Sequence, residues 1–302
     1  MKHMIFSASM TPLDGNGAID GDSLERMLER NLRHGVDGFF LLGTMGEGLL
    51  LPSERQLETV RQSVRIVGDR AEVLVNISDF GLPRTFEAMA RYRDLPVNAF
   101  VFQFPPRTRL TVHDPLDYLL RVADRSDRPL YYYHIPSANQ CSLDMHQFRR
   151  ILEHPRIKGM KNSDGGMMLR RELLRLKQDF PESLLFEGQE WSLDEAFLLG
   201  CDGGLCGMVA LGSRIMVRLA KAAGSGDWEE AHRLQEMLID IYHGVYGTDL
   251  ATVWIGQKYA LHRLGVFSGY HSVVHLQNEA LTGAVRQRID ECLERYRGEL
   301  ED

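Results

Sequence analysis

The first two thirds of the chain alternate between short runs rich in β-branched and aromatic residues and longer amphipathic segments of helical period. This alternation favours parallel strands joined by helical crossovers. An open doubly wound sheet is possible, but the G-x-G-x-x-G turn typical of such sheets does not follow the first run. Eight strand–helix repeats instead predict a closed (β/α)8 TIM barrel of the α/β class. The strand-like runs cover residues 5–10, 38–43, 72–76, 99–104, 129–134, 157–161, 184–188 and 203–207.

Capping patterns define the amphipathic segments. The first has Asp22 or Ser23 as its N-cap and Gly35 as its stop. In the second, Ser53 and Gln56 have the spacing of a capping box. Both segments are therefore predicted to be helices that cross over between strands.

The strand pattern ends after about Gly207, and the rest of the chain is predicted to be helical. One further helix completes the barrel repeats. We therefore expect a catalytic barrel domain over residues 1–225 and a C-terminal helical extension over residues 226–302, packed on the barrel.

Charge and composition exclude several classes of protein. The 302 residues carry a net charge of −7 and no block of Lys and Arg, so no nucleic-acid surface is expected. No run approaches the ~18 apolar residues of a membrane span, and the N-terminus lacks the apolar region of a signal peptide. A cytoplasmic protein with reduced thiols is expected, because no CxxC pair occurs among Cys141, Cys201, Cys206 and Cys292.

Two strand-like runs end on residues that an apolar interior does not favour, Tyr133 and Lys161. Alternate residues of a strand share a face, so Tyr131 lies on the side of Tyr133, and Ile157 and Gly159 on the side of Lys161. If these faces line the barrel, Tyr133 and Lys161 stand at the C-terminal mouths of neighbouring strands, where barrel enzymes place their chemistry. Gly159 would leave room for the long amine.

This pairing suggests covalent chemistry. Burial disfavours the charged form of an amine, and a neutral amine attacks a carbonyl to form a Schiff base. A tyrosine hydroxyl beside it can move protons to and from the intermediates. The structural alternative is that Lys161 pairs with a carboxylate such as Asp164 while Tyr133 fills the barrel.

A third feature is the turn Gly43-Thr44-Met45-Gly46-Glu47 after the second run. Glycines on both sides let consecutive backbone N–H groups converge, a geometry suited to a carboxylate. Thr44 adds a hydroxyl, and Glu47 is expected to fix the turn as a hydrogen-bond acceptor. The alternative is an ordinary strand-to-helix turn.

Together, this turn, Tyr133-His134-Ile135-Pro136 and Gly159-Met160-Lys161-Asn162-Ser163 resemble the dihydrodipicolinate synthase and N-acetylneuraminate lyase family, in the same order and spacing. The likeness covers nearly the whole chain. It implies a class I aldolase-type barrel, usually a homotetramer, whose small-molecule partners are a 2-oxo acid such as pyruvate and an aldehyde. The Schiff base forms without a metal or an organic cofactor.

The resemblance also implies roles for individual residues. Lys161 would form the Schiff base, Tyr133 would shuttle protons, and Thr44 would receive the 2-oxo acid carboxylate. The small apolar Cys206 belongs to the glycine-rich segment of strand eight and is not expected to act as a nucleophile. The full set of substrate-binding candidates is Gly43, Met45, Arg107, Asn139, Ser163, Gly188, Gln189, Glu190 and Cys206.

Departures from the family pattern bear on the substrate. Met45 replaces a Thr, Arg107 stands where synthases present a tyrosine to the neighbouring subunit, and Ala138 replaces an arginine that holds the aldehyde's carboxylate. The Glu190-Trp191 pair does not match the sialic acid lyases. We therefore predict reversible aldol cleavage or condensation of pyruvate with an aldehyde, of the 2-keto-3-deoxy sugar acid or 4-hydroxy-2-oxoglutarate type. Alternatives are 4-hydroxy-tetrahydrodipicolinate synthase, a family dehydratase or a non-catalytic 2-oxo acid binding barrel.

Two histidine signals are given structural interpretations. His271 and His275 are four residues apart and could share a helix face, but no third metal ligand is evident. His134 follows Tyr133 and is expected to point away from the barrel interior and serve packing.

Overall fold

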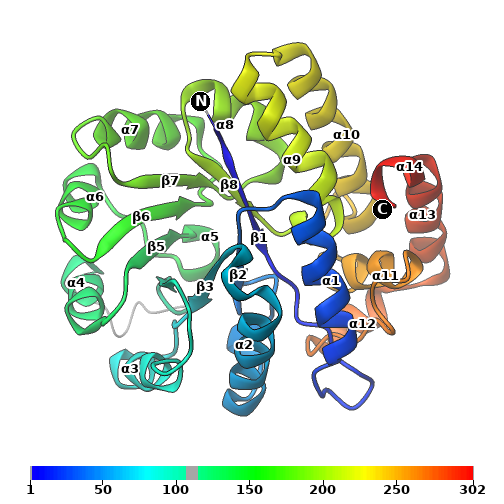
Figure 1. Cartoon of the computed structure of the whole chain (residues 1–302), viewed down its shortest axis with the longest axis horizontal. Coiled ribbons are helices and arrows are strands. Elements are labelled where there is room, and N and C mark those ends of the chain that lie inside the picture. Colours follow the sequence, from blue (N-terminus) through cyan, green and yellow to red (C-terminus); the bar gives the residue numbers. More distant parts are fainter. Residues whose placement is uncertain (1, 107–114, 302) are drawn as a thin grey trace.

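The computed structural model describes residues 2–106 and 115–301, and it forms a closed barrel of eight parallel strands (Figure 1). Each strand pairs with the next along the chain, and β8 pairs with β1 to close the barrel. The predicted (β/α)8 fold is confirmed. The strands are β1 Met4–Ala8, β2 Gly38–Leu41, β3 Glu72–Asn76, β4 Ala99–Phe102, β5 Leu130–His134, β6 Ile157–Asn162, β7 Leu184–Glu187 and β8 Gly203–Cys206.

Helices surround the strands, and α10–α14 gather on one side of the barrel, next to α9 (Figure 1). The predicted domain boundary at residue 225 falls at the end of α9, and the division into two units stays a prediction. No helix among the described residues is long and apolar enough to cross a membrane. The helices are α1 Gly21–His34, α2 Ser53–Val67, α3 Leu82–Arg91, α4 Pro115–Arg125, α5 Pro136–Asn139, α6 Met145–Leu152, α7 Met167–Lys177, α8 Leu193–Leu199, α9 Val209–Ser225, α10 Trp228–Tyr246, α11 Ile255–Arg263, α12 His275–Ala280, α13 Gly283–Arg295 and α14 Arg297–Leu300.

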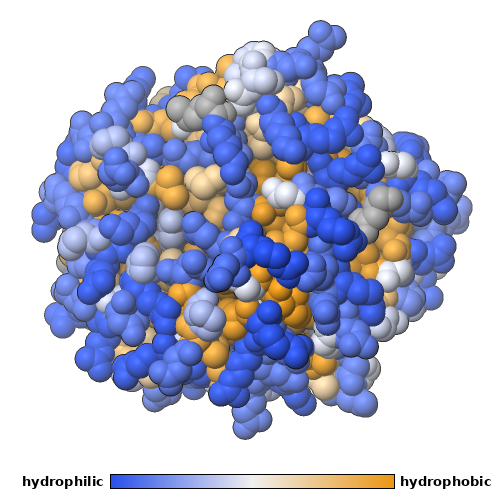
Figure 2. All heavy atoms as spheres, in the orientation of Figure 1, coloured by the Kyte–Doolittle hydropathy of each residue, from blue (hydrophilic) through white to orange (hydrophobic). Residues whose placement is uncertain are grey.

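Two apolar layers hold the barrel together. The larger layer lies between the strands and the helices, and the smaller one fills the barrel interior. On β5, Tyr131 and Tyr133 belong to the interior layer while Tyr132 faces the helices, as the alternation predicts. From outside, hydrophilic residues cover most of the face in Figure 2, and hydrophobic residues gather near its middle.

The alternation fails at one point on β6. Ile157 and Met160 both belong to the layer facing the helices, although Ile157 was expected on the side of Lys161. The register with β5 shifts here, so that Tyr131 pairs with Gly159 and the exposed Lys158 is left out of the ladder. This β-bulge resets the parity of the strand and still leaves Lys161 opposite Tyr133.

Gly159 has a different role from the one expected. Its φ is 155°, and a Cβ there would lie 2.1 Å from the carbonyl oxygen of Leu184. The residue must therefore be glycine because the β7 backbone approaches closely, and not because the lysine amine needs its space.

The predicted end of α1 at Gly35 is confirmed. Gly35 adopts the left-handed conformation, with φ 89°. The N-cap of α1 is Asp20, not Asp22 or Ser23, and its carboxylate accepts a hydrogen bond from the Ser23 N–H at 3.1 Å. The capping box predicted for α2 is wrong. Its N-cap is Pro52, which offers no side-chain hydrogen bond, and the Gln56 amide instead donates to backbone carbonyls of the preceding turn.

Candidate active site

Lys161 and Tyr133 lie side by side at the C-terminal end of the barrel. They are register partners on β6 and β5, and Lys161 is only 5% exposed. Its Nζ lies 4.2 Å from the centroid of the Tyr133 ring and 5.8 Å from that of Phe40. The amine therefore sits in an apolar, aromatic environment at the mouth of the interior.

The alternative ion pair with Asp164 does not form. Asp164 is exposed, and its carboxylate accepts a hydrogen bond from the Gly166 N–H at 3.1 Å. Within residues 2–106 and 115–301, the lysines that form ion pairs are Lys2, Lys177 and Lys258. The Lys161 amine has no carboxylate partner among these residues, so it is available to a ligand.

Gly188, directly after β7, shapes the space around the lysine stem. A Cβ at this position would lie 2.0 Å from Ser163 Oγ and 2.7 Å from Lys161 Cε. Its N–H continues the ladder by donating to the Asn162 carbonyl at 2.8 Å. The backbone at Gly188 thus packs against both side chains and limits where the Lys161 amine can move.

Glu187 and Arg170 support this loop from behind. The two side chains form a buried ion pair of 2.7 Å, and Glu187 also accepts hydrogen bonds from the N–H groups of Gly188 and Gln189. Burial raises the pKa of the Glu187 carboxyl, and the Arg170 guanidinium opposes that effect. The loop after β7 is therefore fixed in place by a buried ion pair that also binds its backbone.

Replacing Gly188 by alanine is expected to lower kcat by about 10²-fold if Lys161 is the reacting amine, because the added methyl displaces Lys161 by the order of 1 Å. Gly15→Ala is the control, since a Cβ there meets nothing within 4 Å. Steady-state rates together with thermal unfolding separate lost positioning from lost stability. A Gly188→Ala variant that turns over at the wild-type rate would contradict this account of the loop.

The turn after β2 presents its backbone to the same mouth. Thr44 is exposed, and its carbonyl accepts a hydrogen bond from the Trp254 indole N–H at 2.9 Å. Met45 is partly buried against the interior layer, and a Cβ on Gly207 would lie 2.4 Å from Met45 Cγ. Met45 thus packs between the turn and the loop after β8, where the family pattern has a hydroxyl.

Glu47 fixes this turn, as expected, but through partners that the sequence did not reveal. The residue has a left-handed φ of 53° and is buried. Its carboxylate forms a buried ion pair with Lys258 of α11 and accepts hydrogen bonds from the Ser272 hydroxyl and the Val273 N–H. Burial lowers the pKa of Lys258, and the Glu47 charge opposes the shift.

The C-terminal extension therefore helps to build the mouth of the barrel. Besides the contacts of Trp254 and Lys258, the Gln257 amide donates to the Gly207 carbonyl at 2.9 Å. All three come from one short stretch around the start of α11. The signal for this in the sequence is the pair Gln257-Lys258 inside the mostly apolar run "WIGQKYAL".

The structure places some of the predicted substrate-binding residues near Lys161. Ser163 follows β6, with its N–H donating to the His134 carbonyl at 2.8 Å and its hydroxyl beside Gly188. The Gln189 amide donates to the Ser163 carbonyl at 3.0 Å. Arg107 lies outside the described residues.

Other candidates are engaged with the backbone. The Asn139 side chain bonds the Phe104 carbonyl and the Cys141 N–H, and Glu190 accepts from the N–H groups of Gly207 and Met208. These contacts stabilise loops, and they give no support to a role for either residue in binding the aldehyde.

Cys206 and His134 are buried. Burial raises the pKa of the Cys206 thiol well above its ordinary value, so the thiol is unreactive, as expected. Burial lowers the pKa of His134 to about 4, and the ring packs edge-on against Phe148 at 5.1 Å. His271 and His275 do not share a helix face, because α12 begins at His275 and His271 precedes it. No cluster of three or more potential metal ligands occurs in the described part of the chain.

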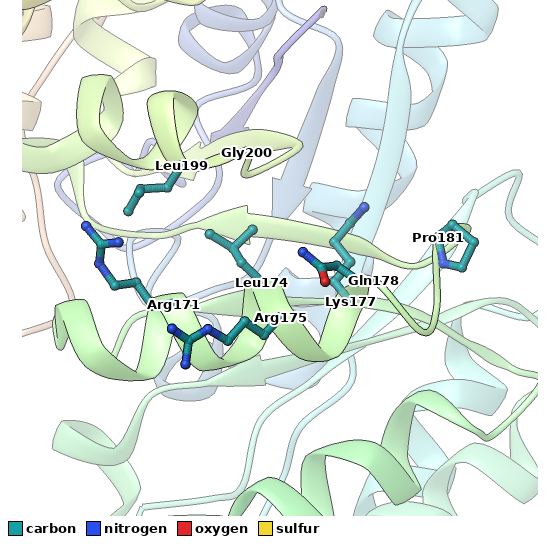
Figure 3. Close-up of a pocket in the computed structure, with 8 residues that line it drawn as sticks. All are labelled: Arg171, Leu174, Arg175, Lys177, Gln178, Pro181, Leu199 and Gly200. Carbon is teal, nitrogen blue, oxygen red and sulfur yellow. The ribbon is translucent and has the colours of Figure 1, made fainter.

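A cationic hollow of about 400 Å³ on the flank of the barrel is separate from this site (Figure 3). Arg171 and Arg175 of α7 line it together with Pro181 and Gly200. Pro181 precedes β7 and Gly200 precedes β8, so the hollow lies toward the N-terminal ends of the strands. Barrel chemistry sits at the opposite end.

Comparison with known proteins agrees with this geometry. The model of the dihydrodipicolinate synthetase family matches residues 1–285. The chain belongs to this family. It is accordingly a lyase of the class I aldolase type, as the sequence motifs predicted.

Similar proteins include a curated relative and two solved structures. A 4-hydroxy-tetrahydrodipicolinate synthase of Stutzerimonas stutzeri (strain A1501) is 26% identical over 86% of this chain and 87% of its own length. The structure of dihydrodipicolinate synthase from Bacteroides thetaiotaomicron superposes with a TM-score of 0.88 at 26% identity, covering 97% of this chain and 98% of that one. CdNal from Clostridium difficile, solved in complex with mannosamine, shares the fold with a TM-score of 0.86 at 20% identity, covering 98% of this chain and 99% of that one.

Proposed function

We propose that the protein catalyses the reversible aldol condensation of pyruvate with an aldehyde through a Schiff base on Lys161. The proposal rests chiefly on one observation, the buried Lys161 amine lying 4.2 Å from the Tyr133 ring centroid with no ion-pair partner among the described residues. Such an amine is suited to nucleophilic attack on a carbonyl.

The steps follow from the positions of these groups. The Lys161 amine adds to C2 of pyruvate, and loss of water gives the imine. The Tyr133 hydroxyl protonates the departing water, and the phenolate so formed takes a C3 proton to give the enamine, whose C3 attacks the aldehyde carbon. The Tyr133 hydroxyl delivers a proton to the aldehyde oxygen, and water then hydrolyses the imine. The Thr44 hydroxyl and the N–H groups of the Gly43–Gly46 turn hold the pyruvate carboxylate.

The identity of the aldehyde and the product of the reaction distinguish this proposal from its alternatives. The 4-hydroxy-tetrahydrodipicolinate synthase activity is named for relatives at about 26% identity, while Ala138 offers no cation to an anionic acceptor. A dehydratase would release a dehydrated 2-oxo acid instead of pyruvate. A non-catalytic barrel would bind pyruvate and turn over no member of a panel of aldehydes and 2-oxo acids. The homotetramer stays a prediction.

Hydrogen exchange in pyruvate tests the shared half of the mechanism without any acceptor. In deuterium oxide, the wild-type protein is expected to replace the methyl hydrogens of pyruvate with deuterium, as followed by NMR. Tyr133→Phe should slow this exchange by about 10²–10⁴-fold, because the proton shuttle is lost. Tyr131→Phe, on the same face of β5 but deeper in the barrel, is the matched control and should exchange at the wild-type rate. Exchange no faster than in protein-free solution would overturn the proposal.

A further inference from the structure

A pocket of about 190 Å³ opens beside the carboxylate-binding turn, and we call it the mouth pocket. It shares Gly43 and Thr44 with that turn, and its lining residue Gln103 follows β4, the strand next to β5, which carries Tyr133. A ligand in the pocket is therefore expected beside the pyruvate carboxylate that the turn is proposed to hold. Exposed Leu50 and Phe80 form part of its wall. Its apolar lining is formed by Leu42, Leu49, Leu50, Phe80, Ala138 and Trp254.

One polar group in this lining has no partner. Gln103 continues the inward face of β4 after Ala99 and Val101, and it is only 4% exposed. Its side-chain oxygen Oε1 is buried without a hydrogen-bond partner in the described structure. Buried polar groups nearly always form hydrogen bonds. A hydrogen-bond acceptor without a partner in a pocket therefore indicates a ligand that carries a hydrogen-bond donor.

The neighbouring amide shows the contrast. Asn76 also lines the mouth pocket, but its Nδ2 donates to the Leu42 carbonyl at 2.9 Å and its Oδ1 accepts from the Ser78 hydroxyl at 2.7 Å. Asn76 is therefore committed to the protein. Thr44, which also lines the pocket, is assigned to the pyruvate carboxylate, so Gln103 is the polar side chain that we assign to the aldehyde.

The charges of the lining residues and the volume of the pocket further restrict the kind of ligand. Glu47 is the one charged residue among the described residues that line the pocket, and its carboxylate is bound by Lys258 and Ser272. Among the lining residues that the structure describes, none offers a cation to an anionic aldehyde, and Arg107 lies outside them. An apolar cavity of about 150 Å³ holds a benzene molecule, so the mouth pocket has the volume for a single ring.

We propose that the acceptor aldehyde has an apolar body of about one ring and one hydrogen-bond donor, which meets Gln103 Oε1. This inference rests on the proposed function and assigns its second substrate. The enamine C3 forms a carbon–carbon bond with the aldehyde carbon, and the aldehyde oxygen takes one proton. Hydrolysis consumes the water released when the imine formed, so the product is the sum of pyruvate and aldehyde.

Condensation of pyruvate with three kinds of aldehyde tests the inference. We expect at least one hydroxybenzaldehyde isomer to exceed benzaldehyde in kcat/KM by at least about tenfold, the effect of one well-placed hydrogen bond. Glyceraldehyde, which is small and polar, should react at least tenfold more slowly than that isomer. Gln103→Met keeps the volume but removes the hydrogen-bond acceptor, and should lower kcat/KM for that hydroxybenzaldehyde to the value for benzaldehyde.

These measurements distinguish failure of the inference about the aldehyde from failure of the proposed function. Exchange into pyruvate combined with a preference for glyceraldehyde would overturn the acceptor inference and leave the proposed function standing, whereas absence of exchange would overturn both. Phe80→Ser on the exposed wall tests another occupant. If it breaks an oligomer in sedimentation without changing aldehyde preference, a second copy of the chain covers the pocket and the inference is wrong.

Discussion

Replacement of Lys161 by methionine is expected to lower kcat for condensation and cleavage by about 10⁴-fold or more, because the covalent route disappears with the amine. Methionine is nearly as long and is apolar, so it fits the buried position beside Tyr133 and Phe40. The fold should therefore survive, which circular dichroism and thermal unfolding can verify.

Lys158 provides the matched control. It lies on the same strand, three residues before Lys161, but the β-bulge leaves it exposed. Lys158→Met should retain wild-type kcat and KM. Comparable losses in the two variants would mean that the rate depends on the charge of the strand and not on one amine at the barrel mouth.

Loss of the Lys258 amine is expected to have the largest effect on stability. Lys258→Met leaves the Glu47 carboxylate buried without its counter-ion, and removal of one partner of a buried pair costs about 3–5 kcal/mol. The turn that we propose to hold the pyruvate carboxylate should also loosen, which raises KM for pyruvate more than it lowers kcat. Urea unfolding and steady-state kinetics measure the two effects.

The double variant Glu47→Leu/Lys258→Met separates the pair from its individual residues. Since it removes both charges together, its free energy of unfolding should fall by less than the sum of the two single losses. Additive losses would show that the two side chains stabilise the protein independently. Lys221→Met, at an exposed position on α9, is the control for removal of a positive charge.

The strands could be predicted because alternation and local composition determine them. The same logic placed Tyr133 and Lys161 on the inner face, since side-chain direction has a period of two along a strand. It failed at Ile157, where a bulge adds one residue to the strand and resets the parity. The same alternation predicts that Gln103 faces the barrel interior, because it continues the inward series of Ala99 and Val101.

The support of the site could not be predicted in the same way. Glu47 and Lys258 are separated by 211 positions, and no local pattern relates the two residues. The N-cap of α2 depended on Pro52 and on backbone carbonyls that only the folded turn presents to Gln56. Contacts that depend on tertiary structure require the fold before the partners can be identified.

Reduction with borohydride in the presence of pyruvate, followed by mass spectrometry of the peptides, tests the covalent chemistry most directly. We expect one stable adduct per chain, with the mass of reduced pyruvate, on the peptide that contains Lys161. The adduct should be absent from Lys161→Met and present in Lys158→Met. An adduct that forms equally well on Lys161→Met, or no adduct on the wild-type protein, would contradict the proposed covalent chemistry.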